Sequence, residues 1–268
     1  MPESPVIYNV RIKYPPVSAM LSDKSKTVIL PSTEELACSD DIPVDNEDQN
    51  FLPNILLFLL TSIWADRTDW YFGVDMAIYH TTGVNPRVPV VPDGFLSLGV
   101  ERKKGGKSRR SYAVWEENEV VPILALEMVS HTPGDEYDEK LEIYRKLGVL
   151  YYIIYNPEFW LRDRHQPFEI YKLIDENYRL QIGEPLWMPE VGLGIGRHQG
   201  VIGGIQQEFL SWYNGQGDRY LMADEIAQQE SQRAENEQQR AEQEKQRAEQ
   251  LAQYLRSIGV DPDNLPNN

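Results

Sequence analysis

The hydrophobic positions of the chain fall into blocks, and the first long block covers residues 43–67. It opens with capping residues and acids and then becomes apolar on most sides. This pattern predicts a buried helix that begins near Asp45 or Asn46, because short polar side chains satisfy the free amides of a first helical turn. The apolar part, 51–64, contains Pro53 and is too short to span a bilayer comfortably, so we expect a core helix and no membrane association.

Four further blocks are rich in aromatic and β-branched residues, which favour strands: 70–81, 87–100, 121–130 and 150–160. The second is interrupted by Pro92, and because proline donates no hydrogen bond to a sheet, we expect an edge or a bulge there. Between the second and third blocks, residues 101–120 predict a basic tip and a polar strand. The last block is too apolar for an exposed edge, which predicts a central strand.

Apolar residues recur at a spacing of three and four within 134–149, which predicts an amphipathic helix. The residues of this apolar face are Tyr137, Leu141, Tyr144 and Leu147. Gly148 predicts the end of this helix, because glycine adopts the left-handed conformation that helix ends require. Residues 168–181 alternate and turn at 175–177, which predicts a hairpin, and 182–215 predict short strands or loops over the sheet.

The composition changes near residue 222, and a seven-residue repeat follows over 232–252. The seam positions of this repeat are alanine and glutamate in alternation: Ala234, Glu237, Ala241, Glu244 and Ala248. Because the second seam position is charged, only half of a coiled-coil seam exists. The pattern favours a solvated helix and leaves open weak self-association as a homodimer or contact with a partner helix.

The composition is that of an ordinary globular protein, with 41% hydrophobic residues and six tryptophans, so a core can form. The formal net charge of −16 repels nucleic acid on average, so contact with DNA requires a local basic patch or bound cations. Cys38 is the only cysteine, which excludes an intramolecular disulfide and a four-cysteine zinc site. The N-terminal residues show no secretion signal, and we expect a cytoplasmic protein.

Two acidic residues stand out, Asp93 after a proline and Glu127 inside an apolar strand block. If the two strands are neighbours, these carboxylates converge at one edge of a sheet. They suit a hard cation, Mg²⁺ or Mn²⁺, with the carbonyl of Met128 as a third oxygen ligand. Such an ion would polarise a phosphodiester oxygen and lower the pKa of a bound water, and Lys140 on the next helix could orient that water or stabilise phosphate charge.

Each of these residues also has a structural interpretation. Asp93 suits a turn, Glu127 an ion pair at a strand end, and Lys140 an exposed surface position. Glu47 and Asp75 are further candidates near the site, although an acid at a helix N-terminus explains Glu47 about as well. The four histidines show no metal-ligand spacing.

The successive motifs VPDGF, LALEMVS and DEKLEIY resemble the PD-(D/E)xK nuclease superfamily and, more closely, its Uma2 family of restriction endonucleases. That family shows a Pro-Asp pair, an acid-x-Val-Ser strand, and a lysine followed four residues later by tyrosine. The matching residues are Pro92–Asp93, Glu127–Ser130, Lys140 and Tyr144, and the resemblance covers roughly 45–175. It implies a metal-dependent nuclease that acts on DNA, with Asp93 and Glu127 as metal ligands and Lys140 as a catalytic residue.

The sequence departs from the superfamily pattern in two respects. The usual lysine two residues after the acid is Val129 here, and the resemblance implies that Lys140 on the helix replaces it. The segment between Asp93 and Glu127 is long and holds the densest basic cluster of the chain: Lys103, Lys104, Lys107, Arg109 and Arg110. This cluster suits either contact with the phosphate backbone of DNA or a flexible solvated loop.

The resemblance implies an α/β fold with a restriction-endonuclease-like mixed sheet flanked by helices, followed by an extended C-terminal helix. We expect an N-terminal arm, a nuclease-like domain, a heptad-repeat helix and a tail, over 1–43, 44–220, 221–257 and 258–268. Our first hypothesis is a Mg²⁺-dependent endonuclease that hydrolyses DNA. The alternative is a catalytically inactive nuclease fold that binds or assembles partners through its C-terminal helix, which the acidic surface and Val129 favour.

Overall fold

The computed structural model describes residues 29–40, 46–131, 135–259 and 261 of the chain. Contacts between residues divide the chain into two units, 1–220 and 221–268. Most of the predicted N-terminal arm, the helix start at Asp45 and most of the predicted tail lie outside the described residues. The four-part domain division stays a prediction.

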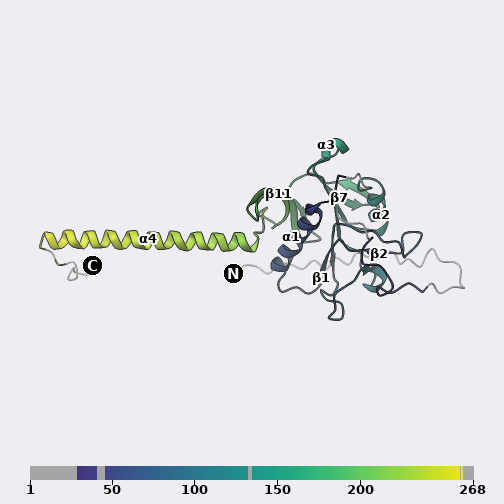
Figure 1. Ribbon diagram of the computed structural model, residues 1–268, viewed down its shortest axis with the longest axis horizontal. Coiled ribbons are helices and arrows are strands. Elements are labelled where there is room, and N and C mark those ends of the chain that lie inside the picture. The colour runs from purple at the N-terminus through teal and green to yellow at the C-terminus, as the bar shows by residue number, and fades with distance from the viewer. Residues whose placement is uncertain (1–28, 41–45, 132–134, 260, 262–268) are drawn as a thin grey trace. The chain divides into compact units, whose positions relative to one another are not determined.

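The first unit is built on a mixed sheet of six strands (Figure 1). In their order across the sheet these are β1 (Trp70–Val74), β3 (Gly94–Leu98), β5 (Leu124–Met128), β6 (Tyr151–Tyr155), β7 (Phe168–Ile174) and β8 (Asn177–Leu180). Strands β5 and β6 are parallel, and the other neighbours are antiparallel. The predicted α/β fold with a mixed sheet is confirmed, and the apolar strand β6 lies inside the sheet as expected.

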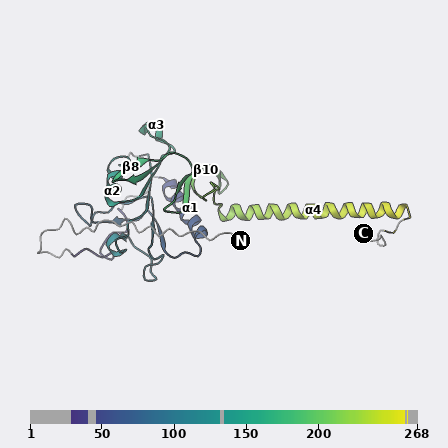
Figure 2. The ribbon, with the colours of Figure 1, turned by 180° about the vertical axis from the view of Figure 1, so that it is seen from behind.

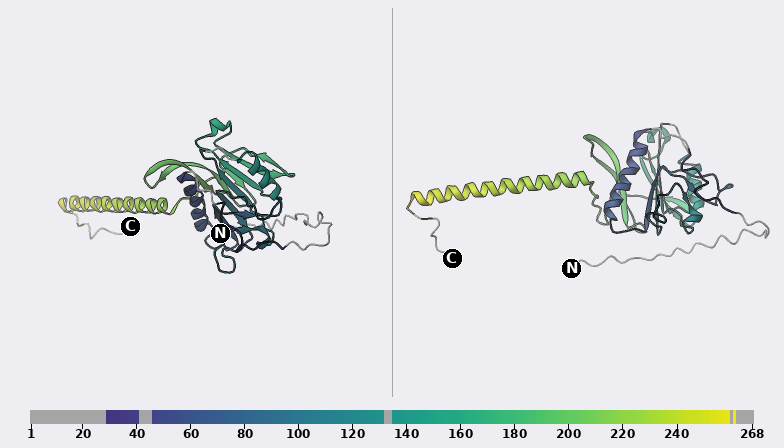
Figure 3. Two further views of the ribbon diagram at one scale, coloured as in Figure 1. Left: turned by 45° about the vertical axis from the view of Figure 1, so that its right-hand side comes forward. Right: turned by 60° about the horizontal axis from the view of Figure 1, so that its bottom comes forward.

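Two helices cover opposite faces of this sheet (Figures 1 and 3). Helix α1 (Glu47–Ile63) begins after Asn46, whose side chain accepts a hydrogen bond from the Gln49 amide at 3.1 Å. Helix α2 (Glu139–Leu147) ends at Gly148, where φ is 89°. The start of α1 and the end of α2 agree with the sequence patterns. Tyr144 of α2 packs in one core cluster with Phe95 of the sheet. A short helix, α3 (Trp160–Asp163), follows β6.

Three predicted strands are shorter or divided in the structure. Block 70–81 forms β1 and β2 (Ile78–Tyr79), because Asp75 adopts a φ of 46°, which no extended strand can continue. Strand β3 begins only after Asp93, so Asp93 precedes the strand and does not lie within it. The polar strand expected in 101–120 is reduced to β4 (Tyr112–Ala113), which pairs with β2, and a 3₁₀ turn, η2 (Val114–Glu116).

The region 182–215 forms a second, three-stranded sheet (Figure 2). Its strands are β9 (Leu186–Met188), β10 (Leu193–Ile202) and β11 (Ile205–Tyr213). The indole nitrogen of Trp212 donates a hydrogen bond to the carbonyl of Leu56 at 2.9 Å, which holds this sheet against α1. The prediction of short strands or loops holds for β9 but not for β10 and β11, which are long paired strands, and only in β10 do glycines interrupt the hydrophobic alternation.

The second unit contains α4 (Ala223–Ser257), a helix of 35 residues in which no residue is buried. The seven-residue repeat therefore folds as the continuous helix that its pattern predicts. Among all described residues, no helix combines the length and the apolar character that crossing a membrane requires.

Candidate functional site

Asp93 and Glu127 lie at the same end of two neighbouring strands of the central sheet, Asp93 just before β3 and Glu127 within β5. Gly94 pairs with Leu126, and one step further along this antiparallel register Asp93 lies opposite Glu127. Because side chains alternate between the faces of a strand, both acids belong to the face that α2 covers. Oδ2 of Asp93 accepts a hydrogen bond from the amide of Met128 at 2.6 Å, which ties the two strand ends together.

Glu127 is 1% exposed, yet both of its carboxylate oxygens have partners on α2. The ammonium group of Lys140 lies 2.8 Å from Oε2, and the hydroxyl of Tyr144 donates to Oε1 at 2.6 Å. An isolated buried carboxylate costs several kcal/mol, and an ion pair with a further hydrogen bond offsets that cost. Lys140 thus compensates the charge of Glu127 directly.

Helix geometry explains why Lys140 and Tyr144 reach the same carboxylate. They are four residues apart, so their side chains lie one above the other on one side of α2. The amide of Lys140 donates to the carbonyl of Asp135 at 2.9 Å, which fixes the first turn. The resemblance placed both residues in a motif, but the bond from Tyr144 to Glu127 was not anticipated.

The carbonyl of Met128 has a partner from the opposite face. The side-chain amide of Gln49, in the first turn of α1, donates to this carbonyl at 3.3 Å. Gln49 lies two residues after Glu47, the acid considered as an accessory group. Within the described part of the chain, Glu47 makes no hydrogen bond or ion pair with Asp93 or Glu127. The sequence carried no signal for Gln49, because polar residues are common in a first helical turn.

The electrostatics of the site are those of two acids with one nearby cation. Burial, and then the charge of Glu127, raise the pKa of Asp93 well above its ordinary value. Burial also raises the pKa of Glu127, against the opposing effect of Lys140. Burial alone would lower the pKa of Lys140, but the attraction of Glu127 outweighs it and the pKa is raised. The site therefore keeps Lys140 charged and leaves the negative charge of Asp93 poorly compensated.

The donor set of this site fits a hard divalent cation. Asp93 and Glu127 offer carboxylate oxygens and Met128 offers a carbonyl, which are ligand types that Mg²⁺ and Mn²⁺ prefer. The described residues contain no group of three or more His, Cys, Asp or Glu side chains arranged to hold a metal. A cation held here would therefore keep several waters, as Mg²⁺ commonly does.

Asp75 is the second nearby acid that the sequence suggested. Its amide donates to the carbonyl of Asp93 at 3.2 Å, and its charge contributes to raising the pKa of Asp93. Burial and the charge of Asp40 raise the pKa of Asp75 itself. His131, which is close to Glu127 in sequence, packs against Phe159.

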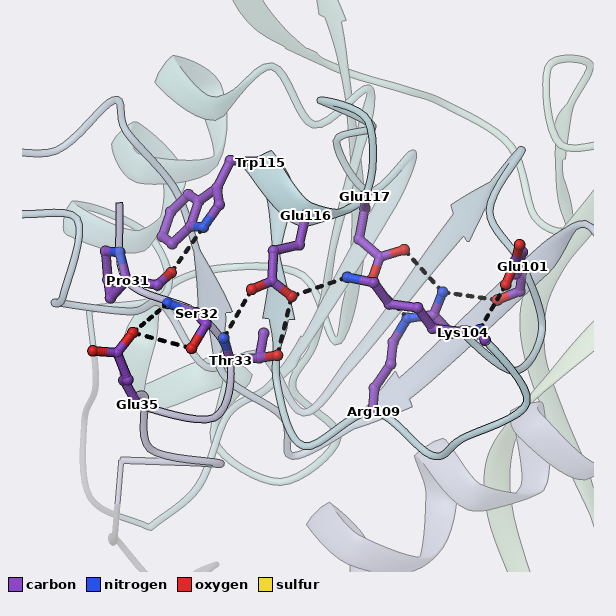
Figure 4. A network of polar contacts seen from close by, with 11 residues as sticks. Pro31, Ser32, Thr33, Glu35, Glu101, Lys104, Arg109, Trp115, Glu116 and Glu117 are labelled. Carbon is purple, nitrogen blue, oxygen red and sulfur yellow. Dashed lines mark hydrogen bonds and ion pairs between the residues drawn. The ribbon is translucent and has the colours of Figure 1, made fainter. Parts of the chain in front are cut away.

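The basic cluster of residues 103–110 is largely engaged in contacts within the protein (Figure 4). Lys104 lies 3.0 Å from Glu116 and 3.3 Å from Glu117. The side chain of Arg109 is 2% exposed, pairs with Glu117 at 2.9 Å and stacks over Tyr71. Neither alternative from the sequence describes these two cations, because their acidic partners lie in the turn that follows the cluster.

Comparisons with known proteins identify one family. A family model described as "Uma2: Putative restriction endonuclease" matches residues 43–199, which is more than half of the chain. The matched region includes the whole central sheet with α1 and α2, and therefore every residue of the candidate site. No curated protein and no solved structure matches the chain.

Proposed function

The chain belongs to the Uma2 family of restriction endonucleases, and from this premise we propose that it is a Mg²⁺- or Mn²⁺-dependent nuclease that hydrolyses phosphodiester bonds of DNA. One observation supports this most: Asp93 and Glu127 lie on facing strand ends while Lys140 reaches the same point from α2. The family supplies the reaction class, and this geometry supplies a group for each task.

Each residue of the site has a distinct task in this proposal. Asp93, Glu127 and the carbonyl of Met128 would hold the cation. When bound, the cation supplies polarisation of a phosphate oxygen and a water of lowered pKa. Lys140 carries a positive charge next to these ligands, where it stabilises the negative charge that develops on the phosphate.

The reaction is the hydrolysis of one ester bond. The oxygen of a water forms a bond to phosphorus, its proton is released, and one P–O bond to the sugar breaks. The leaving oxygen takes up a proton and becomes a hydroxyl. Lys140, which donates to Glu127 at 2.8 Å, has further N–H bonds with which to contact the phosphate.

The test is cleavage of supercoiled plasmid DNA with Mg²⁺ or Mn²⁺. We expect Asp93→Asn and Glu127→Gln to lower the rate by about a hundredfold or more, as loss of transition-state stabilisation does. Glu142→Gln is the matched control, because Glu142 lies on α2 but pairs with Arg145 at the surface. Equal cutting by wild type, Asp93→Asn and the control would refute the assignment.

Calorimetric titration with Mn²⁺ tests metal binding independently of the nucleic acid substrate. Wild type should bind one equivalent, and Glu127→Gln should bind much more weakly, because a carboxylate ligand is replaced by a neutral amide. Metal binding without cleavage of any nucleic acid would instead favour the inactive nuclease fold that acts as a binding module.

A further inference from the structure

A cavity of about 510 Å³ shares Lys140 with the candidate site. Three segments that are distant in sequence form its wall: 37–40 ahead of α1, 87–91 between β2 and β3, and 135–143 at the start of α2. Its volume lies within the range of sites for small molecules and cofactors. Because Lys140 also contacts Glu127, a group in this cavity would be adjacent to the site proposed for the cleaved phosphate.

The wall ahead of α1 is fixed to the body of the protein. The indole of Trp115 donates to the carbonyl of Pro31 at 3.0 Å, and Glu116 accepts two bonds from Thr33, at 2.9 and 3.0 Å (Figure 4). The side chain of Leu36 is 5% exposed and belongs to a small core cluster with Ala77. These contacts anchor the segment from both a polar and an apolar side.

The same segment is held again directly at the cavity. The hydroxyl of Tyr79 donates to the carbonyl of Ala37 at 3.1 Å, and the amide of Ala77 donates to the carbonyl of Cys38 at 2.9 Å. The cavity wall is therefore formed before any ligand arrives, and a ligand need not order this segment. The segment lies ahead of residue 43, where the family match begins.

The charges of the wall disfavour a phosphate as the occupant. Three carboxylates, Asp40, Asp135 and Glu139, line the cavity with two cations, Arg87 and Lys140. The carboxylates outnumber the cations, and Glu127 offsets part of the charge of Lys140. An anion would be repelled, whereas a neutral group with hydrogen-bond donors would find acceptors.

The remaining wall is mostly apolar, with Ser39 and Tyr79 as its other polar residues. Pro89, Val91 and Ile143 line the cavity, and Val88 beside them is 60% exposed. Apolar walls that also hold carboxylates suit a flat ring that carries amino groups, because carboxylates accept hydrogen bonds from the exocyclic amino group of a base.

We propose that this cavity binds one base of the nucleic acid substrate, next to the cleaved phosphate, and prefers a base with an exocyclic amino group over thymine. The proposal rests on the proposed nuclease function and deepens it by assigning a source of base preference. Glu139 and Asp40 act as hydrogen-bond acceptors in this assignment, and the cation ligands Asp93 and Glu127 take no part in base selection.

The test uses the full chain and a library of oligonucleotides, single- and double-stranded, with randomised bases, whose cut ends are sequenced. Wild type should disfavour thymine at one position near the cut by about tenfold, the size of one lost base contact. Glu139→Gln and Asp40→Asn should flatten the profile at that position alone. Glu142→Gln, on α2 but outside the cavity, should keep the wild-type profile.

A flat wild-type profile, or a preference that both cavity variants retain, would overturn the assignment. A second measurement does not depend on cleavage: titration of wild type with cytidine, adenosine, guanosine or thymidine, followed by NMR. Binding of the amino-bearing nucleosides that Glu139→Gln abolishes would support the cavity even if nothing is cut, and the nuclease proposal alone would then fail. The cavity proposal is rejected if the experiments show no base-dependent cleavage and no nucleoside binding.

Discussion

The hydroxyl of Tyr144 donates a hydrogen bond of 2.6 Å to Oε1 of Glu127, and both side chains are buried. This contact, with the ion pair to Lys140, explains how an acid is accommodated in the interior of an apolar strand. It also fixes the orientation of the carboxylate that we propose as a metal ligand. Tyr144 is thus a positioning residue for Glu127.

Replacing Tyr144 by Phe should lower the free energy of unfolding by about 1.5–3 kcal/mol, because a buried carboxylate loses a hydrogen bond. The bond lowers the pKa of Glu127, so its removal should raise that pKa further. We expect weaker Mn²⁺ binding as well, measured by calorimetry alongside urea denaturation. Tyr152→Phe is the control, since the Tyr152 hydroxyl bonds the carbonyl of Glu136 and not Glu127. If Tyr144→Phe and Tyr152→Phe lose Mn²⁺ affinity equally, Tyr144 has a structural role and does not position Glu127 for the metal.

Asp93 should make the metal-free protein less stable as the pH rises. Its pKa is raised in the folded state, so the folded protein binds the proton more tightly than the unfolded chain. Its contribution to stability is fully present below the unfolded pKa of about 4 and is lost as pH rises through the raised folded value. Asp93→Asn should therefore be more stable than wild type near neutral pH.

Thermal unfolding of both proteins across pH, in the presence of a chelator, measures this difference. The stability difference should shrink toward acid pH, where the carboxyl group is protonated in both states. Near neutral pH, saturating Mn²⁺ should make wild type more stable than Asp93→Asn. A ligand at a hundred times its Kd stabilises the folded protein by about 2.7 kcal/mol, and only wild type keeps the complete site. A constant difference at all pH values would contradict the raised pKa.

Gln49 should affect metal affinity without contributing a ligand. Its side chain donates to the carbonyl of Met128 at 3.3 Å and orients the oxygen that we propose to face the cation. Groups that orient a ligand typically change metal affinity by about 10–100-fold. We expect Gln49→Ala to bind Mn²⁺ more weakly within this range, and the exposed neighbour Asn50→Ala to bind like wild type. An unchanged Mn²⁺ affinity in Gln49→Ala would show either that the Met128 carbonyl is not a ligand or that Gln49 does not orient it.

The sequence indicated the strands and the acids more readily than their partners. Glu127 stood out because charge is rare in an apolar strand, whereas the family resemblance assigned Lys140 to the site. The break at Asp75 was missed because a positive φ at a non-glycine residue leaves little trace in a hydrophobic pattern. The bond from Gln49 was missed because it depends on how α1 packs across the sheet.

The basic cluster of residues 103–110 also has partners that the sequence did not reveal. Consecutive cations suggest a surface that binds phosphate, yet Arg109 is buried against Glu117, eight residues further on. Sequence spacing alone does not reveal this pairing, because β4 and the 3₁₀ turn η2 lie between Arg109 and Glu117, and the two residues meet only once these elements have folded. Charge clusters therefore indicate function only after their internal partners are known.

Arg109→Ala should destabilise the protein by about 3–5 kcal/mol, because it leaves the carboxylate of Glu117 buried with less compensation. Lys107→Ala is the matched control, since Lys107 is exposed in the same cluster and should change stability by less than about 0.5 kcal/mol. Urea denaturation measures both. If Arg109→Ala changes stability as little as Lys107→Ala does, Arg109 is not held by Glu117 and is available to contact DNA.

Helix α4 should stay solvated and monomeric. None of its residues is buried, and its 35 residues exceed the length of about 12–15 below which isolated helices are marginal. The alanine stripe faces glutamates at the second seam position, so two copies would bring like charges together. Ala241→Lys should therefore leave both the mass from light scattering and the helix content from circular dichroism unchanged. A concentration-dependent mass that Ala241→Lys abolishes would show that the stripe forms an interface, and would favour assembly as the role of this helix.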